Sequence, residues 1–420
     1  MPLRRLKDSE TATLIIATSG VQLANGFFGT FLSLRVALEG FDPVMAGLVL
    51  SSYFAGFTAG ALRCAPLIRR IGHIRCYAAF AGMVIAATAA MPLLVGAWPW
   101  IVLRVIVGFG CAGIFVTAES WLNAKAKPLE RGRIFSHYML GTFIALALGQ
   151  LLIIGARVET AAPFSSISVL FALSLIIVST TRAEAPLTAD APSLSGAQLF
   201  RTAPVAVMGS ALSGLITAAF YALVPAWMQG VGIERTTIGF CMLAAVLGGL
   251  AFQLPIGWLS DRSDRRVVLA VLCTGLAMSA GTLVFMPRSL PAILLVSFLL
   301  GGFMSTLYPV SVAHAHDRMP GDRVVAVSGR LILWNGIGSI AGPLAGAILV
   351  SNFEINGILY LMAVAALVLM VLSLGRSLIR ASPLRLKRPF RILAPQAARL
   401  AHAPMEDPEK GPAPNEGSAP

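Results

Sequence analysis

Long apolar stretches separated by short polar segments form the dominant pattern of this chain. Twelve of them carry almost no charge and approach the roughly 20 residues that an α-helix needs to cross about 30 Å of hydrocarbon. They are residues 12–34, 44–64, 75–94, 98–122, 134–156, 162–181, 203–228, 236–258, 267–286, 290–313, 326–350 and 354–375. The pattern predicts an all-α membrane protein with twelve transmembrane helices.

The amino-acid composition is typical of an integral membrane protein. Of its 420 residues, 57% are hydrophobic and 12% charged, whereas a soluble domain carries about 25% charged residues. The net charge of +13 would suggest a nucleic-acid partner for a soluble protein, but here it fits basic loops at one membrane face. The five cysteines form no CxxC pair and lie in or beside apolar spans, so we expect no metal site and no disulfide.

The basic residues of the polar segments predict an orientation. If residues 1–11 lie in the cytoplasm and the spans alternate, the outer segments hold few of the 32 Lys and Arg residues. Those few are Arg35, Arg157, Arg235 and Arg288, and one further arginine, Arg104, lies inside a span. This positive-inside bias places both termini in the cytoplasm.

The spans fall into two groups of six, residues 12–181 and 203–375, with a Pro/Ala/Ser-rich stretch, 182–202, between them. We expect that stretch to be a flexible cytoplasmic loop, and residues 376–420, basic and then Pro-rich, to be a disordered cytoplasmic tail.

A weak internal repeat relates the two groups. When Ala65–Ile74 is placed on Gly257–Arg266, Arg70 falls on Arg262 and Glu130–Arg131 falls on Asp322–Arg323. With one further residue of shift, Gly108 falls on Gly301. Two six-helix bundles of like orientation imply a pseudo-twofold axis along the membrane normal.

The second half also carries the string GWLSDRSDRR at Gly257–Arg266, which resembles the loop signature G-x-L-x-D-R-x-G-R-[RK] of the major facilitator superfamily. Asp264 departs from the signature, because it stands where that family has glycine. In the first half Arg70 and Gly72 are kept, but Arg69 stands where the family has aspartate. The resemblance covers roughly residues 10–380.

Further strings narrow the resemblance to the YcaD-like branch of bacterial members. They are AESWLN at 118–123, RGRIFSHYM at 131–139 and GQLL at 149–152, and Arg104, Gly108 and Gly110 are similar to a second superfamily motif. The resemblance implies secondary transport of a small solute by alternating access, in a bacterial inner membrane, by a monomer and with protons as a candidate coupling ion. Multidrug efflux is the alternative, although the Gly-Pro motif of drug–proton antiporters is absent from span 134–156.

The charged loop invites a specific role. Asp261 is expected near a helix N-terminus, where an anion is favoured, and Arg262 and Arg266 are expected to reach carboxylates on adjacent helices, with Asp317 as one partner. By resemblance these bonds latch the two halves in one state of the transport cycle; the alternative is a solvated loop. The predicted latch comprises Gly257, Asp261, Arg262, Arg265, Arg266, Arg70 and Gly72.

Two charged residues inside spans are candidates for ion coupling. Arg104 either faces a cavity, where it binds an anionic solute or gates protons, or snorkels to the outer interface marked by Trp98 and Trp100. Glu119 either forms an ion pair with Arg70 or Arg75, which we favour, or is a proton-carrying carboxylate.

Polar and aromatic residues near the middle of the spans are candidates for a solute cavity, or else join helices to one another. They are Gln22, Asn25, Tyr53, Tyr221, Tyr308, Trp334 and Asn335. No Walker A motif is present, which excludes ATP hydrolysis as the energy source, and no cofactor is expected. An intramembrane enzyme would need a nucleophile–base pair at membrane depth, and a receptor would need a longer cytoplasmic domain, so both are weaker hypotheses.

Overall fold

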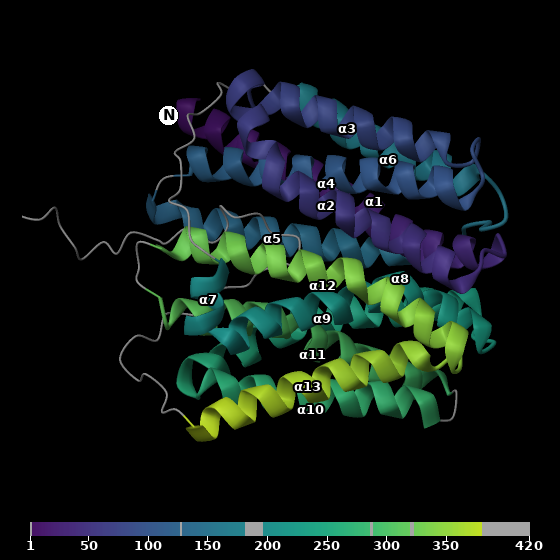
Figure 1. Cartoon of the computed structure of the whole chain (residues 1–420). Helices are drawn as coiled ribbons and strands as arrows, with labels where there is room; N and C mark the ends of the chain where they lie inside the picture. Colours follow the sequence, from purple (N-terminus) through teal and green to yellow (C-terminus); the bar gives the residue numbers. More distant parts are fainter. Residues whose placement is uncertain (1, 127, 181–195, 286–288, 320–322, 380–420) are drawn as a thin grey trace, which may run out of the picture.

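The computed structural model describes residues 2–126, 128–180, 196–285, 289–319 and 323–379, and all regular structure within them is helical (Figure 1). The helices are α1 (Pro2–Leu38), α2 (Pro43–Ile71), α3 (His73–Ala90), α4 (Ala97–Lys125), α5 (Pro128–Leu151), α6 (Ala162–Ser179), α7 (Gly196–Thr202), α8 (Pro204–Gly230), α9 (Arg235–Arg262), α10 (Arg265–Phe285), α11 (Leu290–His316), α12 (Val324–Asn352) and α13 (Gly357–Ile379). Twelve of the described helices, all except α7, are long and apolar enough to cross a membrane. The predicted fold class is confirmed.

The helices begin and end at residues whose chemistry accounts for the boundary. At the start of α2, the Asp42 carboxylate accepts a hydrogen bond of 3.0 Å from the amide of Val44, and Pro43 occupies the first turn, where its missing N–H is not needed. The same helix stops at Gly72, whose φ of 85° lies in the left-handed region that favours glycine.

One predicted loop contains a helix. Residues 196–202, within the stretch expected to be flexible, form α7, because Leu199 is fully buried against Val207 of α8 and Leu331 of α12. Residues 181–195 of the predicted loop and 380–420 of the predicted tail lie outside the described residues.

Equivalent helix crossings repeat in the two halves, α1–α6 and α8–α13. A Cβ atom on Gly108 of α4 would lie 2.0 Å from the carbonyl oxygen of Tyr53 of α2, and one on Gly301 of α11 would lie 2.0 Å from that of Ala245 of α9. Only glycine permits backbones to approach so closely. The alignment of Gly108 with Gly301, expected from the sequence, therefore corresponds to the same contact in each half.

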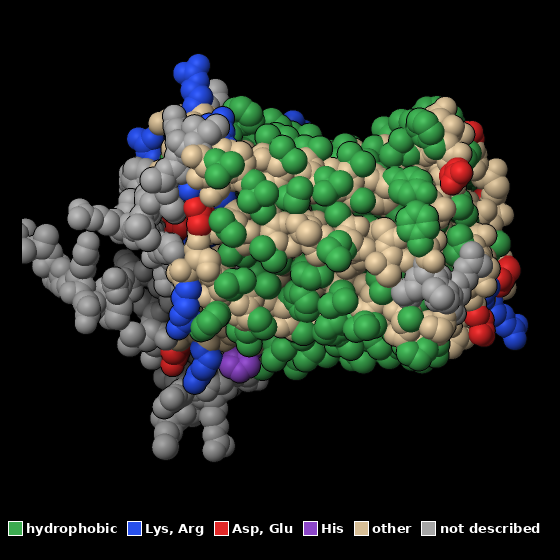
Figure 2. Space-filling view, turned by 90° about the horizontal axis from the view of Figure 1, so that it is seen from below, with side chains coloured by type: hydrophobic (Ala, Val, Ile, Leu, Met, Phe, Trp, Pro, Cys, Tyr) green, Lys and Arg blue, Asp and Glu red, His purple; other side chains and the backbone are tan. Residues whose placement is uncertain are grey.

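The surface shows where lipid would lie. On the face drawn in Figure 2, hydrophobic side chains form a broad band, and charged side chains gather at the two ends of the bundle. We call the end where α1 begins and α13 finishes the terminal end, and the opposite end the distal end (Figure 1). The two halves meet where α2 packs against α12, α1 against α8, and α5 against α9.

Candidate solute cavity and charged clusters

A central cavity of about 160 Å³ lies between the halves. Its wall comes from α1, α2, α4 and α5 of the first half and from α8, α11 and α12 of the second. A water molecule needs roughly 10–15 Å³ by this measure, so a small solute fits. The lining contains many aromatic rings and side-chain amides, and Arg104 is its one ionisable charge at neutral pH.

Most of the predicted cavity residues lie in this wall. Gln22, Asn25, Tyr53, Tyr221 and Asn335 all line the cavity, as does Arg104.

Tyr308 and Trp334 do not line it. Tyr308 is 1% exposed and packs in the apolar cluster around Leu199, and Trp334 packs against the same cluster. Consecutive residues of a helix point about 100° apart, so Trp334 faces away from the cavity that Asn335 faces.

Several polar residues of the wall were not predicted: Thr30, Thr58, Thr142, Gln150, Thr217, Ser305 and Ser339. Gln150 has the clearest role, because its side-chain oxygen accepts a hydrogen bond from the Thr30 hydroxyl and so joins α5 to α1. An uncharged amide inside span 134–156 was a usable signal for Gln150. The hydroxyl residues carry no such signal, since serine and threonine commonly bond back to their own helix.

Arg104 faces the cavity rather than the membrane surface. Its side chain is buried, and its guanidinium carbon lies 4.6 Å from the centre of the Tyr53 ring and 4.9 Å from that of Phe28. The guanidinium Nε has no hydrogen-bond acceptor among the described residues. The ionisable groups that act on Arg104 are Tyr53 and Cys111, and both are neutral at physiological pH. Of the two alternatives, the one in which Arg104 snorkels to the outer interface is therefore not observed.

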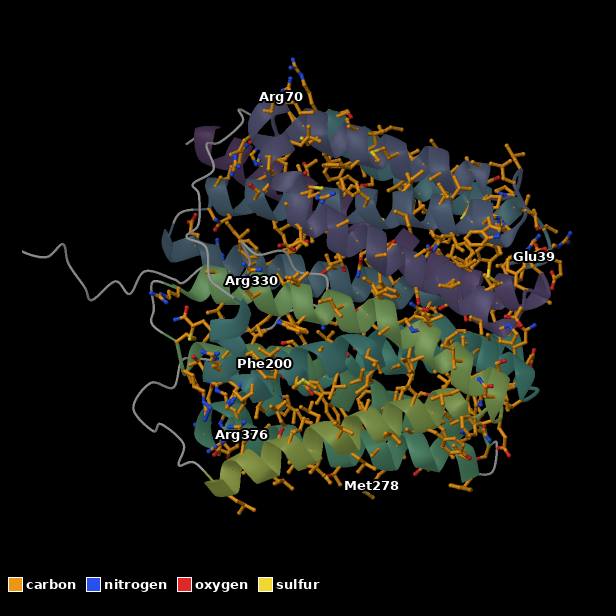
Figure 3. The ribbon with its side chains drawn as sticks, in the orientation of Figure 1. Glu39, Arg70, Phe200, Met278, Arg330 and Arg376 are labelled. Atoms are coloured by element: carbon orange, nitrogen blue, oxygen red, sulfur yellow. The ribbon has the colours of Figure 1, made fainter. Side chains whose placement is uncertain are left out.

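Glu119 lies near the terminal end of α4 and is 1% exposed. The Tyr138 hydroxyl of α5 donates a hydrogen bond of 3.3 Å to its Oε1. Arg70 points away from the bundle (Figure 3), and Arg75 is exposed. Among the described side chains, therefore, the favoured ion pair of Glu119 with Arg70 or Arg75 is not formed.

The charged string of the second half adopts an arrangement that differs from the predicted one. Asp261 lies in the last turn of α9, not at a helix N-terminus. The residue that caps α10 is Asp264, whose Oδ1 accepts a hydrogen bond of 2.9 Å from the amide of Arg266. An aspartate at the glycine position of the signature thus supplies the helix cap.

The predicted carboxylate partner, Asp317 at the C-cap of α11, is bound by Arg265 rather than by Arg262 or Arg266. The Arg265 Nε lies 2.7 Å from Asp317 Oδ2, and Arg265 also donates to Ser260 at 3.0 Å and Asp261 at 3.3 Å. Arg262 instead lies over the Trp258 ring at 4.1 Å. The contacts differ because Arg265 is buried within the bundle, whereas Arg262 remains at its rim.

Arg266 forms the second part of this cluster. It pairs with Asp264 at 2.6 Å and donates a hydrogen bond of 2.6 Å to the carbonyl oxygen of Arg376 at the end of α13. Partial burial raises the pKa of Asp264, but hydrogen bonds from Arg266 outweigh this effect and hold the pKa below its ordinary value. These bonds join α9, α10, α11 and α13, which all belong to the second half.

Contacts between the two halves are found at the distal end. Arg235, the first residue of α9, donates a hydrogen bond of 2.9 Å to the carbonyl oxygen of Ala156 and forms an ion pair of 2.7 Å with Glu159. The Ser33 hydroxyl of α1 accepts a hydrogen bond of 3.3 Å from the amide of Ala226 of α8. The halves are therefore held together at this end in the observed conformation.

Two six-helix halves around a shared polar cavity are the architecture of a secondary transporter. The chain belongs to the Major Facilitator Superfamily, whose sequence profile matches residues 14–230 and 206–400. It is 30% identical to the MFS-type transporter YcaD of Escherichia coli O7:K1 (strain IAI39 / ExPEC) over 372 residues, which cover 87% of this chain and 96% of YcaD. The predicted family and branch are confirmed.

Solved structures show the same fold at low sequence identity. The nucleoside transporter NupG superposes with a TM-score of 0.76 at 12% identity, covering 87% of this chain and 98% of NupG. A D-xylose–proton symporter superposes with a TM-score of 0.67 at 15% identity, covering 86% and 96% of the two chains. The protein is thus a multi-pass membrane protein that carries out secondary transport, and it is not an enzyme.

Proposed function

We propose that the protein moves a small solute through the central cavity by alternating access in a bacterial inner membrane. The observation that carries the proposal is the shared wall: both halves contribute polar residues, such as Asn25 and Asn335, to one cavity. A rocking motion of one half against the other would expose such a cavity to each side in turn.

The positive-inside bias supports an orientation in which the terminal end faces the cytoplasm. In that orientation the distal contacts of Arg235 and Ser33 close the outer side. The conformation described here is then one that is sealed from the outside.

Proton coupling is the more specific part of the proposal. Glu119 is a buried carboxylate that accepts a hydrogen bond from Tyr138. A change of conformation that alters its burial or this hydrogen bond would change its proton affinity between the two states. The similar fold of a D-xylose–proton symporter is compatible with this coupling.

The charged string of the second half is proposed to bias the conformational equilibrium. Arg265 binds Asp317 and Asp261 together, so a movement of α9 against α11 would strain the cluster. A difference of a few kcal/mol suffices to shift a two-state equilibrium. In the first half, Arg70, the counterpart of Arg262, points away from the bundle (Figure 3), so the latch would depend on the second copy.

Solute flux into proteoliposomes tests the proposal. Purified protein should accelerate uptake of at least one small solute from a broad panel, and an imposed pH gradient should change the rate if protons are coupled. Multidrug efflux, the second candidate, predicts instead that several unrelated hydrophobic cations are transported. No protein-dependent flux of any solute would contradict the transport proposal.

A further inference from the structure

Arg104 is a buried cation for which the described side chains provide no anion. It is 6% exposed, and the ionisable groups close enough to act on it are Tyr53 and Cys111. A charged side chain within a membrane span costs at least about 2.5–3.5 kcal/mol on insertion scales. Such a residue usually has a carboxylate partner, or else faces a site that receives one.

The immediate surroundings of Arg104 favour its charged form without satisfying its hydrogen bonds. The rings of Phe28 and Tyr53 face the guanidinium at 4.9 Å and 4.6 Å, and such cation–π contacts attract a cation. Aromatic faces accept no conventional hydrogen bonds, whereas a guanidinium carries five N–H donors. The Nε of Arg104 is buried and has no acceptor among the described residues.

The same cavity presents two further donors in need of acceptors. The Nδ2 of Asn25 on α1 and the hydroxyl of Thr217 on α8 are buried, and neither has a hydrogen-bond partner among the described atoms. Donors from both halves thus line one cavity that also contains Arg104 and no Asp or Glu side chain. A ligand that completes this site must supply acceptor atoms and a negative charge.

The remainder of the wall restricts the body of the ligand. The rings of Phe54, Phe57, Phe143 and Tyr221 line the cavity, which measures about 160 Å³. A single guanidinium balances a single negative charge. Aromatic walls favour a body with apolar or ring-shaped faces.

From these observations we infer that the transported solute is a small organic monocarboxylate whose carboxylate binds Arg104 between Phe28 and Tyr53. The inference rests on the proposed transport function and adds the substrate class. Guanidinium–carboxylate pairs are commonly bidentate, so the fixed ring positions around Arg104 would also orient the solute. Asn25 of the first half and Thr217 of the second would provide further hydrogen bonds.

Matched pairs of an acid and its amide test the inference on the purified full-length protein. Thermal unfolding is followed with benzoate and benzamide, and with cyclohexanecarboxylate and cyclohexanecarboxamide. Each carboxylate should raise the unfolding temperature, and each neutral amide should not. In the R104Q variant the carboxylate affinity should fall about tenfold or more, and R104K should bind more weakly than the parent because its ammonium cannot form the bidentate pair.

The control variant is R70Q, which removes an exposed charge that points away from the bundle (Figure 3), and it should bind like the parent. If R104Q does not fold, N25D provides a second route, because an aspartate in the same cavity would repel a carboxylate and abolish the stabilisation. Equal stabilisation by acids and amides, undiminished binding in R104Q or N25D, or no carboxylate effect on the parent would each overturn the inference.

The flux assay separates this inference from the proposed function. Protein-dependent uptake of neutral solutes that is unchanged in R104Q would support the proposed transport function but refute the inference that the solute is a carboxylate. Absence of flux for every solute would remove the transport function itself.

Discussion

The guanidinium of Arg235 on α9 and the carboxylate of Glu159 lie 2.7 Å apart and join the second half of the bundle to the first at the distal end. Arg235 also donates to the carbonyl oxygen of Ala156. The pair is partly exposed, and such pairs contribute about 0.2–1 kcal/mol. That is enough to alter the populations of two conformations of similar free energy.

We therefore expect R235Q to open the distal end more often than E159Q, since it removes both bonds. The rate at which a membrane-impermeant maleimide labels S339C in the cavity should rise roughly two- to fivefold. The E39Q variant is the matched control, because Glu39, which directly follows α1, pairs with Arg35 of the same half and should not change the rate. Equal labelling in R235Q and the parent would contradict the role of Arg235.

The same pair has a predictable pH response. The pKa of Glu159 is lowered by hydrogen bonds from its own backbone and from Arg235. A carboxylate with a lowered pKa contributes fully above its ordinary pKa and loses the contribution as the pH falls through the lowered value. The labelling rate of the parent divided by that of R235Q, a ratio in which the pH dependence of the cysteine thiolate cancels, should thus stay constant from about pH 5 to pH 8 and rise towards one only in more acidic buffer.

Loss of Asp317 should destabilise the second half. Arg265 is 2% exposed, and D317N would remove the nearer of its two carboxylate partners, at 2.7 Å, while Asp261 stays at 3.3 Å. Breaking a buried ion pair costs about 3–5 kcal/mol, and the second carboxylate should keep the loss at the lower end of that range. Thermal unfolding of the detergent-solubilised protein should begin at a clearly lower temperature. R262Q, which removes a cation from the face of Trp258 at the rim, should lower it little, and an equal effect of the two variants would argue against the buried pair.

The latch hypothesis makes a kinetic prediction. D261N removes a partner of Arg265 that is 38% exposed, so it should change the transport rate with a smaller loss of stability than D317N. Its effect on initial uptake should exceed that of any substitution at Arg69, which stands at the equivalent place in the degraded first copy. A larger effect at Arg69 would assign the latch to the first half.

The glycine crossings predict symmetric sensitivity. A methyl group on Gly108 or Gly301 would meet a backbone carbonyl at 2.0 Å, so G108A and G301A should each destabilise the protein by about 1–3 kcal/mol or more. G82A is the control, because nothing lies within 4 Å of the added methyl. Thermal unfolding measures the stability of all three variants. Unfolding temperatures of G108A and G301A equal to that of the parent would contradict the close approach of the helices.

Proton coupling predicts a selective defect in E119Q. If Glu119 carries the proton, uptake driven by a pH gradient should be lost, while exchange of solute across the membrane without a gradient should persist. Y138F, which removes the hydroxyl that donates to Glu119, should retain coupling with an altered pH dependence. Full gradient-driven uptake in E119Q would exclude this residue as the carrier.

The amino-acid sequence by itself determined the twelve spans, the repeat and the family. Hydrophobic length is a local property, because each span must satisfy its backbone hydrogen bonds internally and expose apolar side chains to lipid. The string Gly257–Arg266 and the pair Gly108 and Gly301 could also be recognised from the sequence. A tight turn and a close helix crossing each restrict the residue types that fit.

Only the tertiary structure decided which polar side chains share a site. Adjacent helical residues diverge by about 100°, so Asn335 lines the cavity and Trp334 does not. Whether Arg104 snorkelled or turned inward depended on Phe28 and Tyr53, which come from two other helices. The choice of Arg265 as the partner of Asp317 likewise depended on how α10 packs against α11, because a pattern along one helix does not specify its rotation against its neighbours.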